Sequence, residues 1–273
     1  MEKNSFEQKN ISKIIETIKG PNGSEVSFYP ERGGIINSMV LNGKEILYLD
    51  EETFKDENAN VRGGIPILFP NSGSLSENSL YPDLAQHGFA RKLKWKKESI
   101  QNGFKEILLS NEETKKIYPY DFRFSVSGNF EQDGSFTLEQ VIENKEEIDM
   151  PISMGLHPYF KVPNSEKKNI KFDFEGSKQI EDQIEKWSNG EYISIDNPKI
   201  KDPKAVIKLI IPSLGTIIID PSIEFEKIWI WSMPGQDFIC VEPVMRDKNG
   251  LIDNPKMIKP KEKLKMSVNF KLE

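Results

Sequence analysis

The sequence predicts an all-β fold, a large antiparallel β-sandwich or barrel, and two observations carry this prediction. In the strongest patterns apolar residues repeat with a period of two rather than 3.6, which is typical of strands with one buried face. Many short β-rich runs are separated by Gly, Pro, Asn and Asp, as in sandwiches and barrels. The evidence for helices is thin by comparison.

The clearest single element is a hairpin in the middle of the chain. Apolar side chains alternate with polar ones over 122–130, and apolar residues again share one face over 136–142. The pair Asp133-Gly134 lies between these segments and favours a tight turn, because glycine tolerates a positive φ. We therefore expect two antiparallel strands with one buried face and one wet face.

Further strands are expected on both sides of this hairpin. The same alternation covers 170–174 and 264–272. Residues 11–18 suit either a short helix or an edge strand, whereas 49–60 and 71–86 read as long loops, on which ligand sites are commonly built. Shorter β-rich runs occur at 26–29, 46–49, 107–109, 206–211, 217–219, 228–231 and 238–241.

The bulk composition restricts the class of protein. The chain has 273 residues, which for an all-β fold suits one domain over 1–273. A net charge of −6 without a basic patch argues against a nucleic-acid partner. The single cysteine, Cys240, excludes an internal disulfide, and neither a signal-like segment nor an apolar run of bilayer length is found. We expect a cytoplasmic protein with no membrane partner.

The chain has only two histidines, and both are candidates for chemistry. His157 precedes a proline, which favours extended backbone, and a strand over 152–156 would put His157 on one face with Ser153 and Gly155. Small neighbours on that face leave room for a ligand. The alternative for His157 is a packing histidine bonded to backbone, and for His87 the structural and functional interpretations carry equal weight.

Glu242 is a third candidate. By alternation, Phe238, Cys240 and Glu242 share one face of the apolar run 238–243. A glutamate on such a strand costs desolvation energy unless it has partners, and Pro243 is expected to end the strand. The alternative is a glutamate at the wet end of a strand that forms a surface salt bridge, and the pattern alone favours this slightly.

Two arginines suit the recognition of a polar ligand. Arg62 precedes the apolar segment 63–70, whose opening glycines allow the backbone to approach a ligand closely. Arg91 lies in the segment 86–91, and both guanidinium groups can donate paired hydrogen bonds to hydroxyls, carboxylates or phosphates. The alternative for each is a buried structural ion pair.

No sequence pattern indicates a metal or a cofactor. Trp229 and Trp231 share a strand face, and although aromatic planes often line sugar sites, alternating tryptophans are more often core, where we place them. Cys240 is expected to be a small buried hydrophobe. The histidines lie far apart in sequence, and the sequence has neither a phosphate-binding glycine loop nor a nucleophilic serine elbow.

Five short segments occur in an order that is typical of one family, and together they span most of the chain. These segments are 30–34 (PERGG), 62–70 (RGGIPILFP), 86–91 (QHGFAR), 157–160 (HPYF) and 241–243 (VEP). In content and order they resemble the aldose 1-epimerase superfamily, and most closely its hexose-6-phosphate 1-epimerase-like branch. The resemblance implies a galactose mutarotase-like β-sandwich, which agrees with the periodicity.

The resemblance also implies roles for individual residues. It makes His157 the catalytic acid and Glu242 the catalytic base. The family has a further sugar-binding aspartate between these two, for which Asp202 has the better spacing and Asp196 is the alternative. The implied contacts to sugar or phosphate come from Arg62, Gln86, His87 and Arg91.

The implied activity is aldose 1-epimerisation, also called mutarotation, of a hexose or a hexose 6-phosphate, with no cofactor and no metal. A glutamate is the natural base at neutral pH, and a neighbouring carboxylate would raise the pKa of the histidine and keep it protonated. The second hypothesis is a non-catalytic carbohydrate-binding protein on the same fold, which would not need both His157 and Glu242. The sequence does not separate phosphorylated from free sugars.

Overall fold

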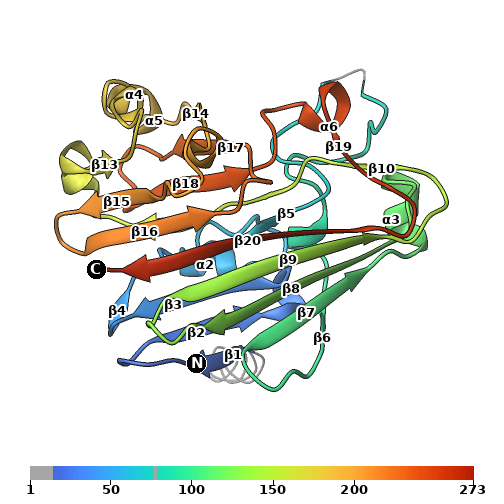
Figure 1. The fold of residues 1–273 in the computed structure, drawn as a ribbon, viewed down its shortest axis with the longest axis horizontal. Coiled ribbons are helices and arrows are strands. Elements are labelled where there is room, and N and C mark those ends of the chain that lie inside the picture. The colour runs from blue at the N-terminus through green and yellow to red at the C-terminus, as the bar shows by residue number, and fades with distance from the viewer. Residues whose placement is uncertain (1–14, 77–78) are drawn as a thin grey trace.

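The computed structural model describes residues 15–76 and 79–273, whose strands form four antiparallel sheets (Figure 1). The largest sheet has eight strands in the order β13-β15-β16-β20-β9-β8-β7-β6. A six-stranded sheet has the order β14-β17-β18-β11-β5, with β12 also paired to β18. Two smaller sheets have the orders β1-β2-β3-β4 and β10-β19. The predicted all-β antiparallel fold is confirmed.

The strands of the two large sheets carry most of the molecule. The eight-stranded sheet consists of β6 (Lys96–Lys97), β7 (Phe104–Leu109), β8 (Phe122–Phe130), β9 (Phe136–Asn144), β13 (Lys171–Asp173), β15 (Ile207–Ile211), β16 (Gly215–Pro221) and β20 (Lys263–Leu272). The six-stranded sheet consists of β5 (Ile67–Leu68), β11 (Gly155–Leu156), β12 (Tyr159–Lys161), β14 (Ile193–Asp196), β17 (Lys227–Trp231) and β18 (Phe238–Val244).

The remaining elements are short and lie around these sheets. The smaller sheets consist of β1 (Glu16–Lys19), β2 (Glu25–Tyr29), β3 (Ile35–Leu41), β4 (Lys44–Glu45), β10 (Met150–Ile152) and β19 (Lys256–Ile258). The α-helices are α2 (Glu51–Lys55), α3 (Glu112–Ile117), α4 (Lys178–Glu181), α5 (Ile184–Trp187) and α6 (Gly250–Asp253). The 3-10 helices are η1 (Pro30–Arg32), η2 (Ala90–Lys92), η3 (Asn164–Asn169) and η4 (Pro198–Ile200). Among the described residues, no helix is long and apolar enough to cross a membrane.

The predicted central hairpin is confirmed. Strands β8 and β9 pair from Phe122 opposite Asn144 to Phe130 opposite Phe136. Gly134 in the turn has a φ of +84°, which is the conformation that the Asp-Gly pair predicted. The alternation at 264–272 corresponds to β20, in which every second side chain from Met266 onward is buried.

Several other segments differ in detail from the prediction. Of the segment 11–18, residues 11–14 lie outside the described part of the chain, and 16–18 belong to the edge strand β1. The expected loop at 49–60 contains α2, because the Asp50 side chain accepts a hydrogen bond from the backbone N–H of Thr53 and caps the helix. The run 46–49 contributes isolated bridges rather than a continuous strand.

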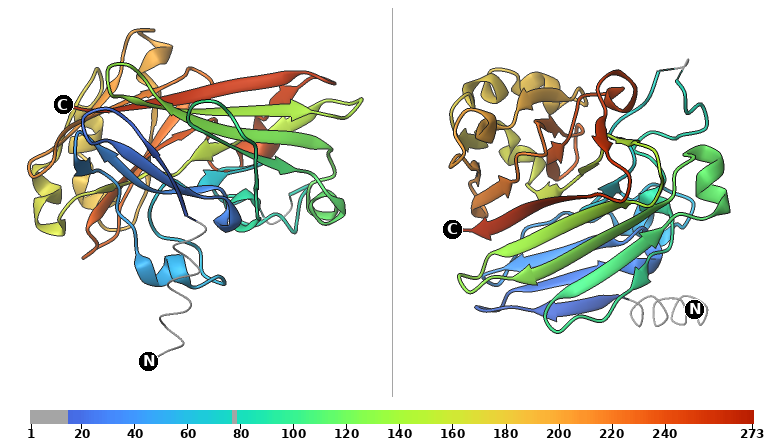
Figure 2. Two further views of the ribbon diagram at one scale, coloured as in Figure 1. Left: turned by 90° about the horizontal axis from the view of Figure 1, so that it is seen from below. Right: turned by 45° about the vertical axis from the view of Figure 1, so that its right-hand side comes forward.

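The hydrophobic core lies between the eight-stranded sheet and the sheets that face it (Figure 2). Phe28 on β2 stacks on Phe104 of β7 with ring centroids 4.2 Å apart. Phe160 on β12 packs on Phe270 of β20 with ring centroids 6.2 Å apart. These aromatic contacts join the layers, because large rings bury the most apolar area per residue.

One face of the six-stranded sheet belongs to this core, and the other face does not. On β18, Ile239 and Val241 point into the core, whereas Phe238 and Cys240 belong to a separate cluster on the opposite face. The strand continues through Pro243, which lies opposite Ile228, so the expectation that this proline ends the strand is wrong. The second face is therefore free to carry a polar site.

A buried carboxyl group is also found inside the sandwich. Glu106 on β7 is completely buried, and neither of its carboxyl oxygens has a hydrogen-bond partner among the residues that the structure describes. Desolvation, with a smaller contribution from Glu16, raises the pKa of Glu106 to about 8. Glu106 is thus protonated in the folded protein at neutral pH, because a buried charge without partners is costly.

We expect this carboxyl group to make stability fall as the pH rises. In the unfolded chain Glu106 ionises near pH 4.5, whereas in the folded chain it ionises near pH 8. The contribution of Glu106 to the free energy of unfolding is therefore fully present below pH 4.5 and is lost as the pH rises towards 8. The loss is on the order of 5 kcal/mol. Urea unfolding at pH 5 and pH 8 measures the difference in the free energy of unfolding between the two pH values, and this difference should disappear in Glu106→Gln. The exposed-site variant Glu147→Gln is the control, and an undiminished pH dependence in Glu106→Gln would contradict the assignment.

Candidate active site

A cavity of about 580 Å³ opens over the polar face of the six-stranded sheet. Its volume lies in the range of small-molecule binding sites. Strands β12, β17 and β18 contribute side chains to the cavity, together with the segments 59–62 and 86–91. Six of the seven predicted site residues line it: Arg62, Gln86, His87, Arg91, His157 and Glu242.

Glu242 reaches the cavity because of the alternation on β18. It lies opposite Trp229 of β17, two residues along the strand from Cys240, which lies opposite Tyr159 of β12. The face predicted for Phe238, Cys240 and Glu242 is therefore confirmed, and it is the face directed away from the core. The wet-end alternative does not hold, because Glu242 is only 2% exposed.

The 62–70 segment supports His157 through the backbone. The N–H of His157 donates to the carbonyl oxygen of Pro66 at 3.1 Å, and the N–H of Tyr159 donates to that of Gly64 at 2.9 Å. The imidazole ring stacks on the ring of Tyr159 with centroids 4.6 Å apart and planes 6° apart. Backbone bonds on one side and a stacked ring on the other hold the imidazole in one orientation.

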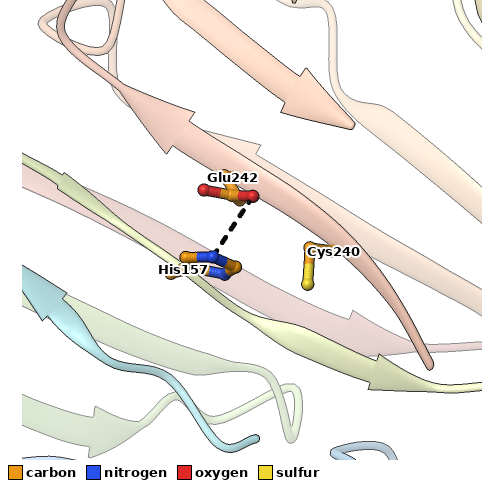
Figure 3. Close-up of side chains that lie close together, drawn as sticks. All are labelled: His157, Cys240 and Glu242. Carbon is orange, nitrogen blue, oxygen red and sulfur yellow. Dashed lines mark ion pairs between the residues drawn. The ribbon is translucent and has the colours of Figure 1, made fainter. Parts of the chain in front are cut away.

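His157 and Glu242 meet at the base of the cavity (Figure 3). His157 Nε2 lies 3.5 Å from Glu242 Oε1, and both side chains are almost fully buried. Their other polar atoms, His157 Nδ1 and Glu242 Oε2, have no hydrogen-bond partner within the described parts of the chain. Buried polar atoms are ordinarily paired, so two unpaired ones on adjacent side chains point to a functional role for the pair.

Burial shifts the two pKa values in opposite directions. Desolvation lowers the pKa of His157 well below 6.5, and the charge of Arg91 adds to this shift. Desolvation raises the pKa of Glu242 well above 4.5, against the effects of Arg91 and Lys248. The expected rise in the histidine's pKa is wrong, because desolvation outweighs the neighbouring carboxylate. The two residues therefore form a coupled pair in which burial opposes the ionised form of each.

His87 forms part of the cavity wall and has a structural bond as well. Its Nδ1 accepts a hydrogen bond from the N–H of Gly73 at 3.0 Å, which places the proton of the neutral ring on Nε2. Desolvation lowers the pKa of His87 to about 3, so the ring is neutral at pH 7. The next residue, Gly88, has a φ of +69°, and a Cβ there would lie 1.9 Å from the carbonyl oxygen of Phe69. Only glycine fits at this position.

Gln86 and Arg91 extend the same wall. The Gln86 side-chain amide lies 3.2 Å from His87 Nε2. Arg91, on η2, donates from Nη2 to the backbone carbonyl oxygen of Gln86 at 2.9 Å. Arg91 therefore binds the backbone of this segment rather than the Gln86 side chain. Because His87 Nε2 carries the proton, a hydrogen bond between His87 and Gln86 requires the amide oxygen, and not the amide nitrogen, to face the ring.

Positive charge predominates in the cavity. Among the described residues that line it, Arg62, Arg91 and Lys248 are the cations and Glu242 is the only carboxylate. Lys248 Nζ lies 3.9 Å from the ring centroid of Tyr192, so the aromatic ring helps to hold the ammonium group. Sequence reasoning missed Lys248, because nothing in its sequence neighbourhood distinguishes it from a surface lysine.

Arg32 holds the segment that carries Arg62. The Arg32 guanidinium donates to the carbonyl oxygen of Glu57 at 2.8 Å and to those of Thr53 and Ala59 at 3.1 Å. Such a fork satisfies several backbone acceptors around the end of α2 at once. The PERGG segment thus supports the cavity wall from behind, and its Gly33 lies directly against the backbone of Arg91.

The structure does not bring Asp202 to the cavity. Asp202 follows η4, and its side chain accepts a hydrogen bond from the backbone N–H of Lys204. It lines a different and smaller hollow, next to Phe174. The alternative, Asp196, pairs with Lys227 at 2.7 Å and is also absent from the cavity lining.

The prediction that the two tryptophans are core residues holds for Trp229 and is wrong for Trp231. Trp229 is 2% exposed and belongs to a small buried cluster with Leu68 and Val244, whereas Trp231 is only partly buried, and both residues line the cavity. Trp229 Nε1 donates to Asp247 Oδ1 at 3.1 Å. The alternation was read correctly, but it could not tell a core face from a cavity face.

The same site brings together three groups of the types that bind metals. Ligand atoms of His157, Cys240 and Glu242 lie within 4.8 Å of one another (Figure 3). No sequence pattern indicated this group, because more than 80 residues separate His157 from Cys240 and Glu242. Only the pairing of β12 with β18 brings the three residues together.

Comparison with solved structures supports the fold. The Slr1438 protein of Synechocystis sp. PCC 6803 is 27% identical, covers 95% of both chains and has a TM-score of 0.82. A galactose mutarotase-related enzyme of Lactobacillus acidophilus has a TM-score of 0.73 over 95% of this chain and 97% of its own, at 20% identity. The second likeness concerns the fold alone. The galactose mutarotase-like β-sandwich is thus shown.

Sequence comparison gives the family. Proteins named "putative glucose-6-phosphate 1-epimerase" from Cenchrus ciliaris and Escherichia coli K12 are each 29% identical, over 177 and 151 residues. These alignments cover 55% and 54% of this chain, and the chain spans about half the length of these curated relatives, 51% and 48%. The family model described as aldose 1-epimerase matches residues 15–210. The chain therefore belongs to the aldose 1-epimerase family.

Proposed function

We propose that this protein is an aldose 1-epimerase that interconverts the α and β anomers of a hexose 6-phosphate, with His157 and Glu242 as its acid and base. The observation that carries the proposal is the 3.5 Å contact between these two side chains at the base of a cavity of hexose size. Family membership supports the reaction class. The names of the curated relatives support a phosphorylated substrate.

The reaction needs two proton transfers at one carbon. A proton leaves the anomeric hydroxyl while another reaches the ring oxygen; the ring opens, the C1–C2 bond rotates, and the hydroxyl attacks the other face of the carbonyl. Both oxygens are bonded to C1, so the base and the acid must lie close together. We assign the base to Glu242 and the acid to His157, and the sugar oxygens take the place of the direct contact between them.

The proton count of the pair suits a reaction of this kind. One proton is taken up at Glu242 and one is given up at His157, so the pair holds one proton before and after the step. Burial favours the neutral form of each group, whereas Arg91 and Lys248 favour the carboxylate of Glu242. Arg91 also disfavours the imidazolium of His157, so its two effects on the pair oppose each other, and Lys248 is the cation that favours the carboxylate alone.

The charge of the cavity supports the phosphorylated substrate. Arg62, Arg91 and Lys248 face a single carboxylate, and a sugar phosphate would balance this excess. A neutral hexose offers no such compensation. His87 Nε2–H and the Gln86 amide are then available to sugar hydroxyls, and the flat faces of Trp231 and Tyr159 to the sugar ring.

Removal of either proton-transfer group should abolish most of the turnover. We expect Glu242→Gln and His157→Asn each to lower kcat by about 10²- to 10⁴-fold, because each removes one positioned acid or base. Anomer exchange by NMR measures the rate, and circular dichroism checks the fold. Glu185→Gln, an exposed glutamate, is the matched control. A Glu242→Gln variant that turns over at the wild-type rate would refute the assignment. If the wild-type protein itself bound the sugar but did not exchange its anomers, a non-catalytic carbohydrate-binding protein would be favoured.

The pH profile should reflect the lowered pKa of the histidine. Because His157 takes up its proton well below pH 6.5, the pair gains a second proton only there, and the acid limb of kcat/KM should have its midpoint below 6.5. The raised pKa of Glu242 delays the loss of a proton from the pair, so the basic limb should lie at a higher pH than an ordinary carboxyl group would give. The profile should be measured with a free hexose, because the phosphate group of a hexose 6-phosphate itself titrates at about pH 6 and would add its own limb. An acid limb at or above 6.5 would contradict the structure.

The cations should distinguish phosphorylated from free sugar. We expect Arg62→Ala and Lys248→Ala to raise KM for hexose 6-phosphate by about 10- to 100-fold each, the cost of one charge-assisted hydrogen bond. KM for the free hexose should change little. Lys259→Ala, on a surface ion pair with Asp149, is the control. Equal effects on both sugars would show that the cations bind hydroxyls rather than phosphate.

A further inference from the structure

We propose that His157, Cys240 and Glu242 form a binding site for a thiophilic divalent cation, Zn²⁺ or Cd²⁺, which blocks the cavity. The three residues offer one imidazole nitrogen, one sulfur and one carboxylate oxygen, all within 4.8 Å of one another. Figure 3 shows the three side chains gathered between the neighbouring strands. This set of nitrogen, sulfur and oxygen ligands is typical of zinc sites.

The backbone arrangement already brings the ligands into position. Cys240 and Glu242 lie two residues apart on β18 and therefore point to the same face, while the pairing of β12 with the same strand brings in His157. Ligands around a tetrahedral Zn²⁺ lie about 3.3 to 3.8 Å apart, given bonds of about 2.0 to 2.3 Å. The 3.5 Å between His157 Nε2 and Glu242 Oε1 already fits, so only the sulfur needs to approach, by about 1 Å.

Two of the three ligands have polar atoms with no protein partner. His157 Nδ1 and Glu242 Oε2 are buried and lack a hydrogen bond within the described residues. No hydrogen bond from the described part of the protein therefore holds Nδ1 or Oε2 in place, and both side chains can bind a metal through Nε2 and Oε1, which lie 3.5 Å apart. A cation that approaches through the cavity would bind both side chains, with its fourth coordination position directed to the cavity and open to water.

Charge balance favours a divalent ion in this buried place. A thiolate from Cys240 and a carboxylate from Glu242 together balance the charge of one divalent ion, and the protons that these ligands carry before binding pass to water. The nearby cations Arg91, Lys248 and Lys167 oppose the metal, so both the thiolate and the carboxylate are needed.

The consequence is reversible inhibition by thiophilic metals. A bound ion would occupy the nitrogen and oxygen atoms that the proposed epimerase reaction uses for proton transfer, so sugar and metal exclude each other. This consequence rests on the proposed function, whereas metal binding itself does not. A direct measurement of binding therefore separates the two proposals.

The single cysteine makes the binding experiment specific. Cys240 is the only thiol in the chain, so any ultraviolet absorption from a Cd²⁺–thiolate bond in the untagged protein reports this site alone. We expect the signal to saturate at one Cd²⁺ per chain and to be absent in Cys240→Ala and Cys240→Ser. His157→Asn and Glu242→Gln should weaken Cd²⁺ binding by about 10- to 100-fold.

An exposed carboxylate away from the site supplies the control. Glu185→Gln should keep Cd²⁺ binding within about twofold, because Glu185 is exposed and is not among the three ligands. A Cd²⁺–thiolate signal that is equally strong in His157→Asn and Glu242→Gln would overturn the proposal, and so would the absence of any signal in the wild-type protein.

Turnover measurements then complete the test. We expect Zn²⁺ to inhibit anomer exchange competitively with the sugar, and Cys240→Ala to keep turnover while losing this inhibition. Inhibition of equal strength in Cys240→Ala would count against the site. If Cd²⁺ binds as described but the protein has no epimerase activity, the proposed function fails and the metal site remains.

Discussion

The structure depends on the burial of a carboxyl group and an imidazole ring against each other on a strand whose opposite face is core. Ile239 and Val241 fix β18 in the sandwich, and the same alternation forces Glu242 to the other side. Desolvation then acts on both groups, lowering the pKa of His157 and raising that of Glu242. Two groups that differ by about two pKa units in water are brought by burial into competition for one proton.

The rigidity of the sheet explains why so few residues are needed around this pair. His157 is held by backbone bonds to the segment 62–70 and by stacking on Tyr159, so its ring has little freedom to turn. Arg32 acts further out, because it binds backbone carbonyls of the segment that carries Arg62. Catalytic geometry is best preserved when such support comes from strands and backbone rather than from mobile side chains.

The same burial gives the site two kinds of chemistry. The two atoms that meet in this pair, His157 Nε2 and Glu242 Oε1, can serve a sugar or, together with Cys240, a metal ion. The cationic side of the cavity, with Arg91 and Lys248, favours anions and opposes free cations. A phosphorylated sugar would bind here because its negative charge balances these cations. A thiophilic metal would bind because the thiolate of Cys240 is a soft ligand.

Alternation and turn residues are local signals, and they were enough to predict the all-β fold, the hairpin at 122–144 and the face of β18 that carries Glu242. The short motifs predicted six residues of the cavity. Only the tertiary structure placed Trp229 and Trp231 on the cavity, removed Asp202 from it and added Lys248. A strand pattern shows that a face is buried, yet whether core or a ligand covers that face depends on strands that pair from distant parts of the chain. The pKa shifts of the pair depend likewise on total burial, which no local pattern encodes.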